Sequence, residues 1–341
     1  MARILVLQLK RIGDAILTAP ALGALRQAWP EAEITLALES AACSLGPAFA
    51  MVDSRLCHAR GRAARHCWRA AMTQRFDLVL DFTGSDRSAG LMLLTRAKTR
   101  VGYAKDAKNW LRRRACTHVS HASVRDLHTI DLHHALVATA LEAVGRPPPP
   151  PVLDAGHLRL PPDLAPPALP LPYVVVHPGT ARAEKYWPAE RWQAVIHHLQ
   201  QQHRLPIVLT GSSAPAEIQH LREIETGIRV QENFAGQLSL LQLSSVVAQA
   251  ALVLGVDSAA MHLAAAFQRP QIALFGPTNP YHWRPRHATA TVLTAGHPAD
   301  FPIAPRHPQH PMSELPVTQV TAAVDCLLAG GATATTFHEP L

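Results

Sequence analysis

The chain has 341 residues, of which 48% are hydrophobic and 17% charged, and its formal net charge at pH 7 is +7. This length favours two domains over one, and the absence of an apolar run of about 18 residues excludes an obvious membrane span, so we expect a soluble protein. The five cysteines are odd in number and scattered, which disfavours a disulfide framework and favours buried thiols in a cytosolic protein.

Short apolar runs alternate with amphipathic helical patterns in the first half of the chain. Strands are predicted near residues 3–8, 33–38 and 77–81, and helices near 17–28, 87–96 and 128–144. The first run is too short for the apolar core of a signal peptide, and Lys10 and Arg11 follow it at once. This alternation is typical of a parallel α/β sheet, so we expect a Rossmann-like domain over residues 1–155.

The loop after the first predicted strand carries a candidate base. Gly13 permits a tight turn there, and Asp14 stands at the start of the next helix. Open α/β sheets bind their ligands at the carboxyl ends of the strands. Asp14 could serve only as a helix N-cap. In the functional interpretation its carboxylate takes the proton of an acceptor hydroxyl, while Lys10 and Arg11 attract an anionic ligand.

Positive charge is concentrated in this first half. Residues 1–156 carry 21 Lys and Arg against 13 Asp and Glu, a balance of +8, whereas residues 157–341 carry 11 against 12, a balance of −1. We therefore expect an anionic partner for the first half, with an ordinary solvated basic face as the alternative. Nucleic acid is disfavoured, because no helix-turn-helix, zinc finger or aromatic-interleaved basic motif accompanies the charge.

Proline marks the boundary between the halves. Residues 146–172 contain eleven prolines, which favour a stiff extended segment over a helix or central strand, and we interpret residues 156–172 as a linker. A second stretch rich in proline and histidine, residues 297–316, is predicted to be a surface loop.

The second half repeats the α/β alternation. Strands are predicted near residues 173–177, 206–210, 251–255 and 271–275, and helices near 188–202, 215–224 and 239–249. This indicates a second Rossmann-like domain over residues 173–341. Neither half carries a Gly-x-Gly-x-x-Gly fingerprint after its first strand or a Walker lysine, which disfavours a dinucleotide dehydrogenase and a P-loop NTPase.

Two loops of the second half suit a phosphate. After the strand near 251–255 the chain turns at Asp257 into a helix, and the first N–H groups and the dipole of such a helix attract anions over residues 258–262. The loop from His177 to Pro188 offers the hydroxyl of Thr180 and the cation of Lys185. The alternatives are a simple N-cap at the first site and a solvated lysine at the second.

Six motifs follow one another over nearly the whole chain. They are Arg11-Ile12-Gly13-Asp14, His177-Pro178-Gly179-Thr180 with Lys185-x-Trp187-Pro188, Leu209-Thr210-Gly211-Ser212, Ala235-Gly236-x-Leu238-Ser239-Leu240, Gly255-Val256-Asp257-Ser258 with Met261-His262-Leu263-Ala264-Ala265-Ala266, and Leu274-Phe275-Gly276-Pro277-Thr278. In this order and spacing they resemble glycosyltransferase family 9, the bacterial lipopolysaccharide heptosyltransferases. The resemblance implies a GT-B fold, with two Rossmann-like domains whose parallel sheets face each other across a cleft.

The resemblance also implies an activity and roles for individual residues. It implies metal-independent, inverting transfer of heptose from ADP-heptose to a hydroxyl of the phosphorylated lipid A inner core, with Asp14 as the general base. The residues implied to bind the donor are Thr180, Lys185, Glu217, Asp257, Ser258, Ala259, Met261 and His262. Those expected at the anionic acceptor are Lys10, Arg11, Arg112 and Arg113.

No metal or other cofactor is expected. The chain has no Asp-x-Asp pair to hold a divalent ion on a sugar nucleotide, and the pattern Cys57-His58 with His66-Cys67 matches no standard zinc spacing. His133-His134 and His197-His198 are interpreted as surface or packing residues on helices.

Other functions stay open. They are a family member that moves another nucleotide-activated sugar to a different surface glycan, a GT-B nucleotide-sugar epimerase, and a catalytically dead binding module. Peripheral contact of the basic surface with the inner face of the inner membrane is also open.

Overall fold

The structure is a computed structural model that describes residues 1–59, 62–106, 109–150 and 158–330, without the side chains of residues 62–64. The chain divides into two compact units: unit 1 is Met1–Leu153 with His157–Arg159, and unit 2 is Asp154–Gly156 with Leu160–Leu341. Of the linker expected over residues 156–172, residues 158–172 form neither helix nor strand, and residues 156 and 157 lie outside the described part of the chain. In the described ranges no helix is both long and apolar enough to cross a membrane.

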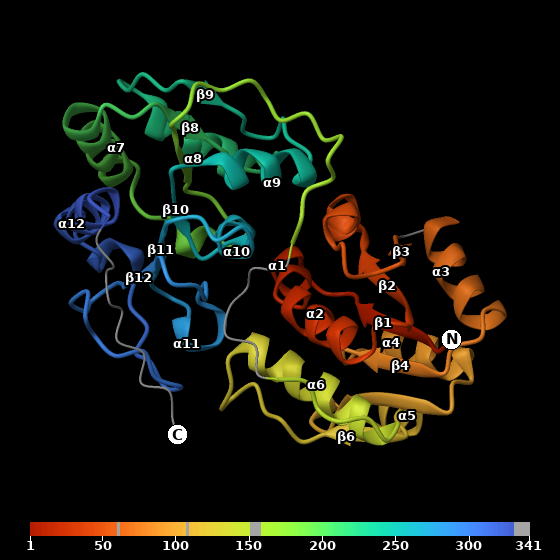
Figure 1. Cartoon of the computed structure of the whole chain (residues 1–341). Helices are drawn as coiled ribbons and strands as arrows, with labels where there is room; N and C mark the ends of the chain where they lie inside the picture. Colours follow the sequence, from red (N-terminus) through yellow and green to blue (C-terminus); the bar gives the residue numbers. More distant parts are fainter. Residues whose placement is uncertain (60–61, 107–108, 151–157, 331–341) are drawn as a thin grey trace. The chain divides into compact units, whose positions relative to one another are not determined.

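Unit 1 is built on a parallel six-stranded sheet in the order β3-β2-β1-β4-β5-β6, coloured from red to yellow in Figure 1. Its strands are β1 (Arg3–Gln8), β2 (Glu33–Glu39), β3 (Ser54–His58), β4 (Leu78–Asp81), β5 (Thr99–Tyr103) and β6 (His118–Ser120). Its helices are α1 (Ile12–Ile16), α2 (Ala19–Ala28), α3 (Arg62–Thr73), α4 (Asp86–Thr95), α5 (Trp110–Ala115) and α6 (Thr129–Ala143), with a 3₁₀ segment at Ser40–Ala48.

Unit 2 has the same architecture, with strand order β12-β11-β10-β7-β8-β9 (Figure 1). Its strands are β7 (Val174–His177), β8 (Ile207–Leu209), β9 (Glu232–Asn233), β10 (Leu252–Val256), β11 (Gln271–Phe275) and β12 (Ala290–Thr294). Its helices are α7 (Ala189–His198), α8 (Pro215–Glu225), α9 (Leu240–Gln249), α10 (Ala259–Ala266), α11 (Pro280–Trp283) and α12 (Val317–Leu328). A π-helical turn, Leu199–His203, continues α7, and 3₁₀ turns lie at Ala183–Lys185 and Met312–Glu314.

The first strand of each unit lies at the centre of its sheet. β1 pairs with β2 on one side and β4 on the other, and β7 pairs with β8 and β10. The order of strands therefore reverses beside β1 and beside β7. In open parallel sheets the loops at such a reversal diverge and leave room for a ligand at the carboxyl ends of the strands.

Burial explains which strands a sequence pattern can reveal. The central strands are apolar throughout: every residue of β10 is buried, and so are all but the first of β1. Both faces of such a strand are covered by helices, so the strand reads as a continuous hydrophobic run. The edge strand β3 exposes Ser54 and Arg55, and β9 has only two residues.

The expected α/β fold of two parallel sheets is confirmed, with three local corrections. First, Cys43 and Cys57 form a disulfide with 5.6 Å between their Cα atoms, because the parallel pairing of β2 with β3 brings the segments that carry them together. Second, the stretch 297–316 is a loop but is not confined to the surface, since Met312 and Leu315 are buried in the core of unit 2. Third, the helix expected near 17–28 is α2, and a separate short helix, α1, precedes it.

Candidate functional site

A cavity of about 810 Å³ opens in unit 1 beside Asp14. It lies where β1, β2 and β3 end, and residues of α3 and α4 complete it. Its lining is Leu9, Lys10, Arg11, Asp14, Glu39, Ala41, His58, Ala59, Trp68 and Arg87. Two of the four expected acceptor residues, Lys10 and Arg11, therefore share one cavity with the expected base.

Asp14 does not cap a helix. It is the third residue of α1, whose N-cap position is held by Arg11. Its backbone is fixed from two sides, because its carbonyl oxygen accepts hydrogen bonds from Thr18 Oγ1 at 2.8 Å and from Gln8 Nε2 at 3.3 Å. Burial raises the pKa of the Asp14 carboxyl, and the charge of Lys10 opposes that rise. A carboxylate of raised pKa in a cavity is a candidate proton acceptor.

Some charged and polar side chains around this cavity have a partner within the protein, and others do not. Arg87 donates to Glu39 at 3.0 Å, whereas no ion pair within the described residues engages the side chain of Lys10 or Arg11. His58 is 6% exposed, and neither of its ring nitrogens has a hydrogen-bond partner among the described residues. Lys10 and Arg11 are thus available to an anion that enters the cavity.

The other two expected acceptor residues lie outside this cavity lining. Arg112 on α5 donates to Asp86 on α4 at 2.7 Å, and Arg113 is exposed on α5. Sequence reasoning missed Glu39 and His58, which end β2 and β3, together with Trp68 and Arg87. Glu39 directly follows the strand predicted near 33–38, which is the signal that could have found it, and His58 could have been found in the same way had β3 been predicted.

In unit 2, Lys185 and Asp257 contact each other directly. Lys185 ends the 3₁₀ turn that follows β7, and its Nζ lies 2.6 Å from Asp257 Oδ2 at the end of β10. Thr278, after β11, donates its hydroxyl to the same oxygen at 2.9 Å. Lys185 and Asp257 are both buried, at 9% and 8% exposure. Three loops at the carboxyl edge of the sheet are thereby joined at one charged contact.

Helix α10 begins next to this contact. Its N-cap residue Ser258 makes no capping hydrogen bond, and its buried hydroxyl has no partner among the described residues. His262 is 5% exposed, its Nδ1 also lacks a partner in the described part of the chain, and burial lowers its pKa. Ala259 and Met261 lie in the first turn of the same helix. The first turn of α10 thus offers polar groups that the protein itself leaves unused.

Glu217 supports the loop that carries Thr180. Its carboxylate is 2% exposed and accepts hydrogen bonds from the backbone N–H of Ser212 at 3.0 Å and from its hydroxyl at 2.5 Å. A Cβ on Gly179 would lie 2.2 Å from Glu217 Oε1, so that only glycine allows this approach. Glu217 packs beneath the residue that precedes half-buried Thr180.

His177, at the end of β7, lies beside the same carboxylate. Its Nδ1 is 2.9 Å from the hydroxyl of Thr210, and its Nε2 is 3.9 Å from Glu217 Oε1. Burial lowers the pKa of His177, and the charge of Glu217 opposes the shift. The loops after β7 and β8 are therefore held together by buried polar contacts.

Comparison with known proteins decides the family. The model of glycosyltransferase family 9 (heptosyltransferase) matches residues 64–303. The chain belongs to glycosyltransferase family 9. It is therefore a glycosyltransferase, and the resemblance seen in its motifs is confirmed.

Individual heptosyltransferases match over most of their length. Lipopolysaccharide heptosyltransferase 3 of Escherichia coli is 25% identical over 338 residues, 95% of this chain and 98% of that protein. Lipopolysaccharide heptosyltransferase 1 of Salmonella typhimurium is 27% identical over 299 residues, 82% of this chain and 89% of that protein. The solved structure of E. coli heptosyltransferase WaaC with ADP has a TM-score of 0.76 at 24% identity and covers 95% of this chain and 99% of its own. This likeness confirms the GT-B fold.

Proposed function

We propose that this enzyme transfers heptose from ADP-heptose to a hydroxyl of the lipopolysaccharide inner core. The observation that carries the proposal is the position of Asp14 in a cavity with Lys10 and Arg11, two cations that have no ion-pair partner within the described residues. Relatives over nearly the full chain are named lipopolysaccharide heptosyltransferases, and WaaC was solved with ADP and with ADP-2-deoxy-2-fluoro heptose. These names and ligands support heptose as the sugar and ADP as its carrier.

The proposed reaction is a single inverting displacement. The acceptor oxygen attacks the anomeric carbon, the bond from that carbon to the diphosphate oxygen breaks, and Asp14 takes the hydroxyl proton. A carboxylate with a raised pKa is a stronger base than an ordinary aspartate, and the positive charge of Lys10 favours its ionised form. Lys10 and Arg11 attract the phosphorylated acceptor.

Donor binding is proposed for the loops of unit 2. Lys185 pairs with the diphosphate, and Asp257 accepts hydrogen bonds from sugar hydroxyls once Lys185 turns to the donor. N–H groups at the start of α10 and the hydroxyl of Thr180 add donors for the phosphates, which stabilise the charge that grows on departing ADP. Glu217 is proposed to bind the ribose only indirectly, because its carboxylate is already engaged by Ser212.

The proposed chemistry needs no metal, because side chains and a helix N-terminus supply the charge that a divalent ion would otherwise provide. We place the reaction in the cytoplasm, close to the inner face of the inner membrane. The basic surface of residues 1–156 supports contact with an anionic lipid-linked acceptor.

Mass spectrometry tests the proposal directly. The protein is incubated in EDTA with ADP-heptose and a panel of inner-core acceptors, beside the variant Asp14→Asn. We expect the acceptor to gain one heptose with the wild type only. Binding of ADP-heptose without transfer to any acceptor would point to another acceptor, consumption of donor without acceptor would indicate an epimerase, and absence of binding would refute the proposed donor.

A further inference from the structure

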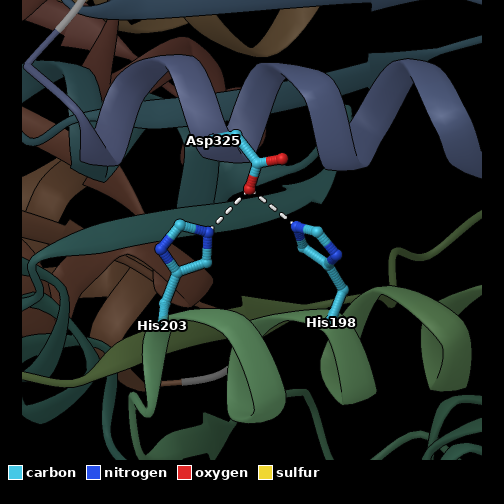
Figure 2. Close-up of side chains that lie close together, drawn as sticks. All are labelled: His198, His203 and Asp325. Carbon is cyan, nitrogen blue, oxygen red and sulfur yellow. Dashed lines mark hydrogen bonds and ion pairs between the residues drawn. The ribbon is translucent and has the colours of Figure 1, made fainter.

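Three potential metal ligands converge in unit 2, on helices that no step of the proposed reaction uses. Figure 2 shows His198 and His203 on one helical segment, pointing at Asp325 on α12. The Nε2 atoms of the two imidazoles each lie 2.6 Å from the same carboxylate oxygen, Oδ1 of Asp325. One ligand atom from each of the three side chains lies within 4.8 Å of the other two.

A change of helix type brings the two histidines together. Residues five apart on an α-helix point about 140° away from each other, so His198 and His203 would not share a face of a regular helix. Here α7 ends at His198, and Leu199–His203 forms a π-helical turn whose hydrogen bonds span five residues. The next residue, Arg204, has φ 55°, a left-handed conformation that is costly for a residue with a side chain.

The conformational cost of this turn is offset by an interaction of the side chains that it positions. π-helical turns are rare and occur frequently at functional sites. In this chain the turn directs both imidazoles at one carboxylate on the last described helix, 122 residues along the chain from His203. The contact therefore fastens α12 to the end of α7.

The ligand set selects a class of ion. Imidazole suits zinc, copper, nickel and iron, whereas magnesium and calcium prefer oxygen ligands alone. Ligands on a tetrahedral zinc ion lie roughly 3.3 Å apart, since each bond is about 2.0 to 2.1 Å long. The observed 2.6 Å separations would need to widen by less than about 1 Å. The Asp325 side chain is 51% exposed, so it can move by that amount and water can complete the coordination.

We propose that His198, His203 and Asp325 form a binding site for one divalent transition-metal ion of the zinc class. The ion clamps α12 to α7 and leaves its remaining coordination to water. Pro188, at the start of α7, is about 15 Å from His198 along the helix axis, so the ion is remote from the loops proposed to hold the donor. The site therefore serves stability and takes no part in sugar transfer.

A zinc titration tests this site. The tag-free full-length protein is first stripped of metal with EDTA, and the EDTA is then removed before zinc is added. Calorimetry is expected to show one zinc ion per chain with micromolar affinity or better, and zinc should raise the melting temperature. Asp325→Asn keeps an oxygen that accepts both histidine hydrogen bonds but removes the anionic ligand. It should weaken zinc binding at least about tenfold and abolish the thermal shift, as should His203→Gln.

Two histidine variants serve as controls. His197→Gln removes the exposed neighbour of His198 and should leave zinc binding unchanged. His310→Gln alters the separate cluster in which the rings of His297 and His310 lie 4.8 Å apart, and should likewise change nothing. The proposal is overturned if zinc binds only at millimolar concentration, if Asp325→Asn and His203→Gln bind it as the wild type does, or if His310→Gln removes the binding.

Discussion

Lys185 and Asp257 are 72 residues apart in the chain, and Nζ of the first lies 2.6 Å from Oδ2 of the second. Their buried contact joins the loop after β7 to the loop after β10, where the strand order of unit 2 reverses. The sequence suggested each residue separately as a donor ligand. In the structure the two side chains form an ion pair with each other, so the diphosphate proposed to bind Lys185 would compete with Asp257 for it.

The first prediction concerns this ion pair. Lys185→Ala removes the cation that pairs with the buried carboxylate of Asp257 and leaves it the hydrogen bond from Thr278, which should cost on the order of 3 kcal/mol of unfolding free energy. It should also weaken ADP binding by about ten- to a hundredfold through the lost charged hydrogen bond. Urea denaturation and calorimetry measure the two effects.

Arg182→Ala is the matched control for Lys185→Ala. Arg182 belongs to the same loop and pairs with Glu184, but its side chain is 44% exposed. Exposed pairs of this kind contribute little to stability. Equal losses of stability in Arg182→Ala and Lys185→Ala would show that the buried pair has no special role.

A second prediction follows from the position of Asp14. Asp14→Asn is nearly isosteric and keeps the backbone carbonyl that Thr18 and Gln8 hold, so the fold should persist. Loss of the base should lower kcat about 10² to 10⁴-fold, while the dissociation constant of ADP-heptose stays within about twofold of the wild type. A variant that loses donor binding and turnover together would contradict the assignment of Asp14 as the base.

The pH profile gives a third prediction. As the proposed base, Asp14 can accept a proton only when ionised, and burial raises its pKa, so kcat/KM should fall as the pH drops through that raised value. The charge of Lys10 lowers this pKa, so Lys10→Met should move the acid limb of the profile, the fall of kcat/KM at low pH, to higher pH. Arg113→Ala, an exposed charge outside the cavity lining, should leave the limb where it is. An unshifted limb in Lys10→Met would show that another group titrates.

Gly179 supplies a fourth prediction. Gly179→Ala would place a Cβ 2.2 Å from Glu217 Oε1, so either the carboxylate or the loop must shift. We expect a loss of about 1 to 3 kcal/mol in stability and weaker donor binding, because Thr180 follows directly. In a Glu217→Ala background the same substitution should cost clearly less. A double-mutant cycle by urea denaturation measures this coupling, and additive losses would argue against the steric contact.

Much of the fold was predictable because the central strands are covered on both faces. Such strands read as unbroken apolar runs, and those predicted at 3–8 and 251–255 agree closely with β1 and β10. The edge strand β3, with sequence Ser-Arg-Leu-Cys-His, has one face in solvent and too few apolar residues to be recognised. The disulfide between Cys43 and Cys57 was not predicted for the same reason, since it depends on the pairing of β2 with β3.

The residues around the candidate site were only partly predictable. Asp14 and Asp257 stand next to strong strand patterns, so their place at the carboxyl edge followed from the sequence. The pairings between distant loops could not be predicted, because contacts such as that of Lys185 with Asp257 depend on side-chain packing rather than on a local sequence pattern. His198 and His203 point the same way because a π-helical turn follows α7. The sequence predicted a regular helix over 188–202 and gave no sign of that turn.

The last prediction concerns His133 on α6, which is buried beside the segment that follows Asp14. The single hydroxyl hydrogen of Thr18 goes to the carbonyl of Asp14, so Nδ1 of His133 carries its own hydrogen and donates to Leu17 O at 3.1 Å. Burial lowers the pKa of His133 from 6.5 to about 3. The unfolded chain therefore binds a proton first as the pH falls, and stability should drop between about pH 6.5 and pH 3.

This loss should approach, at most, about 4 kcal/mol at the acid end of that window. His133→Asn removes the titrating group and should flatten the dependence of unfolding free energy on pH from 7 to 4, although the variant is less stable at pH 7 because its packing against Phe82 is lost. His134→Gln, a half-buried neighbour on the same helix, should keep the acid sensitivity. If the unfolding free energy of His133→Asn falls with pH as steeply as that of the wild type, another group takes up the proton.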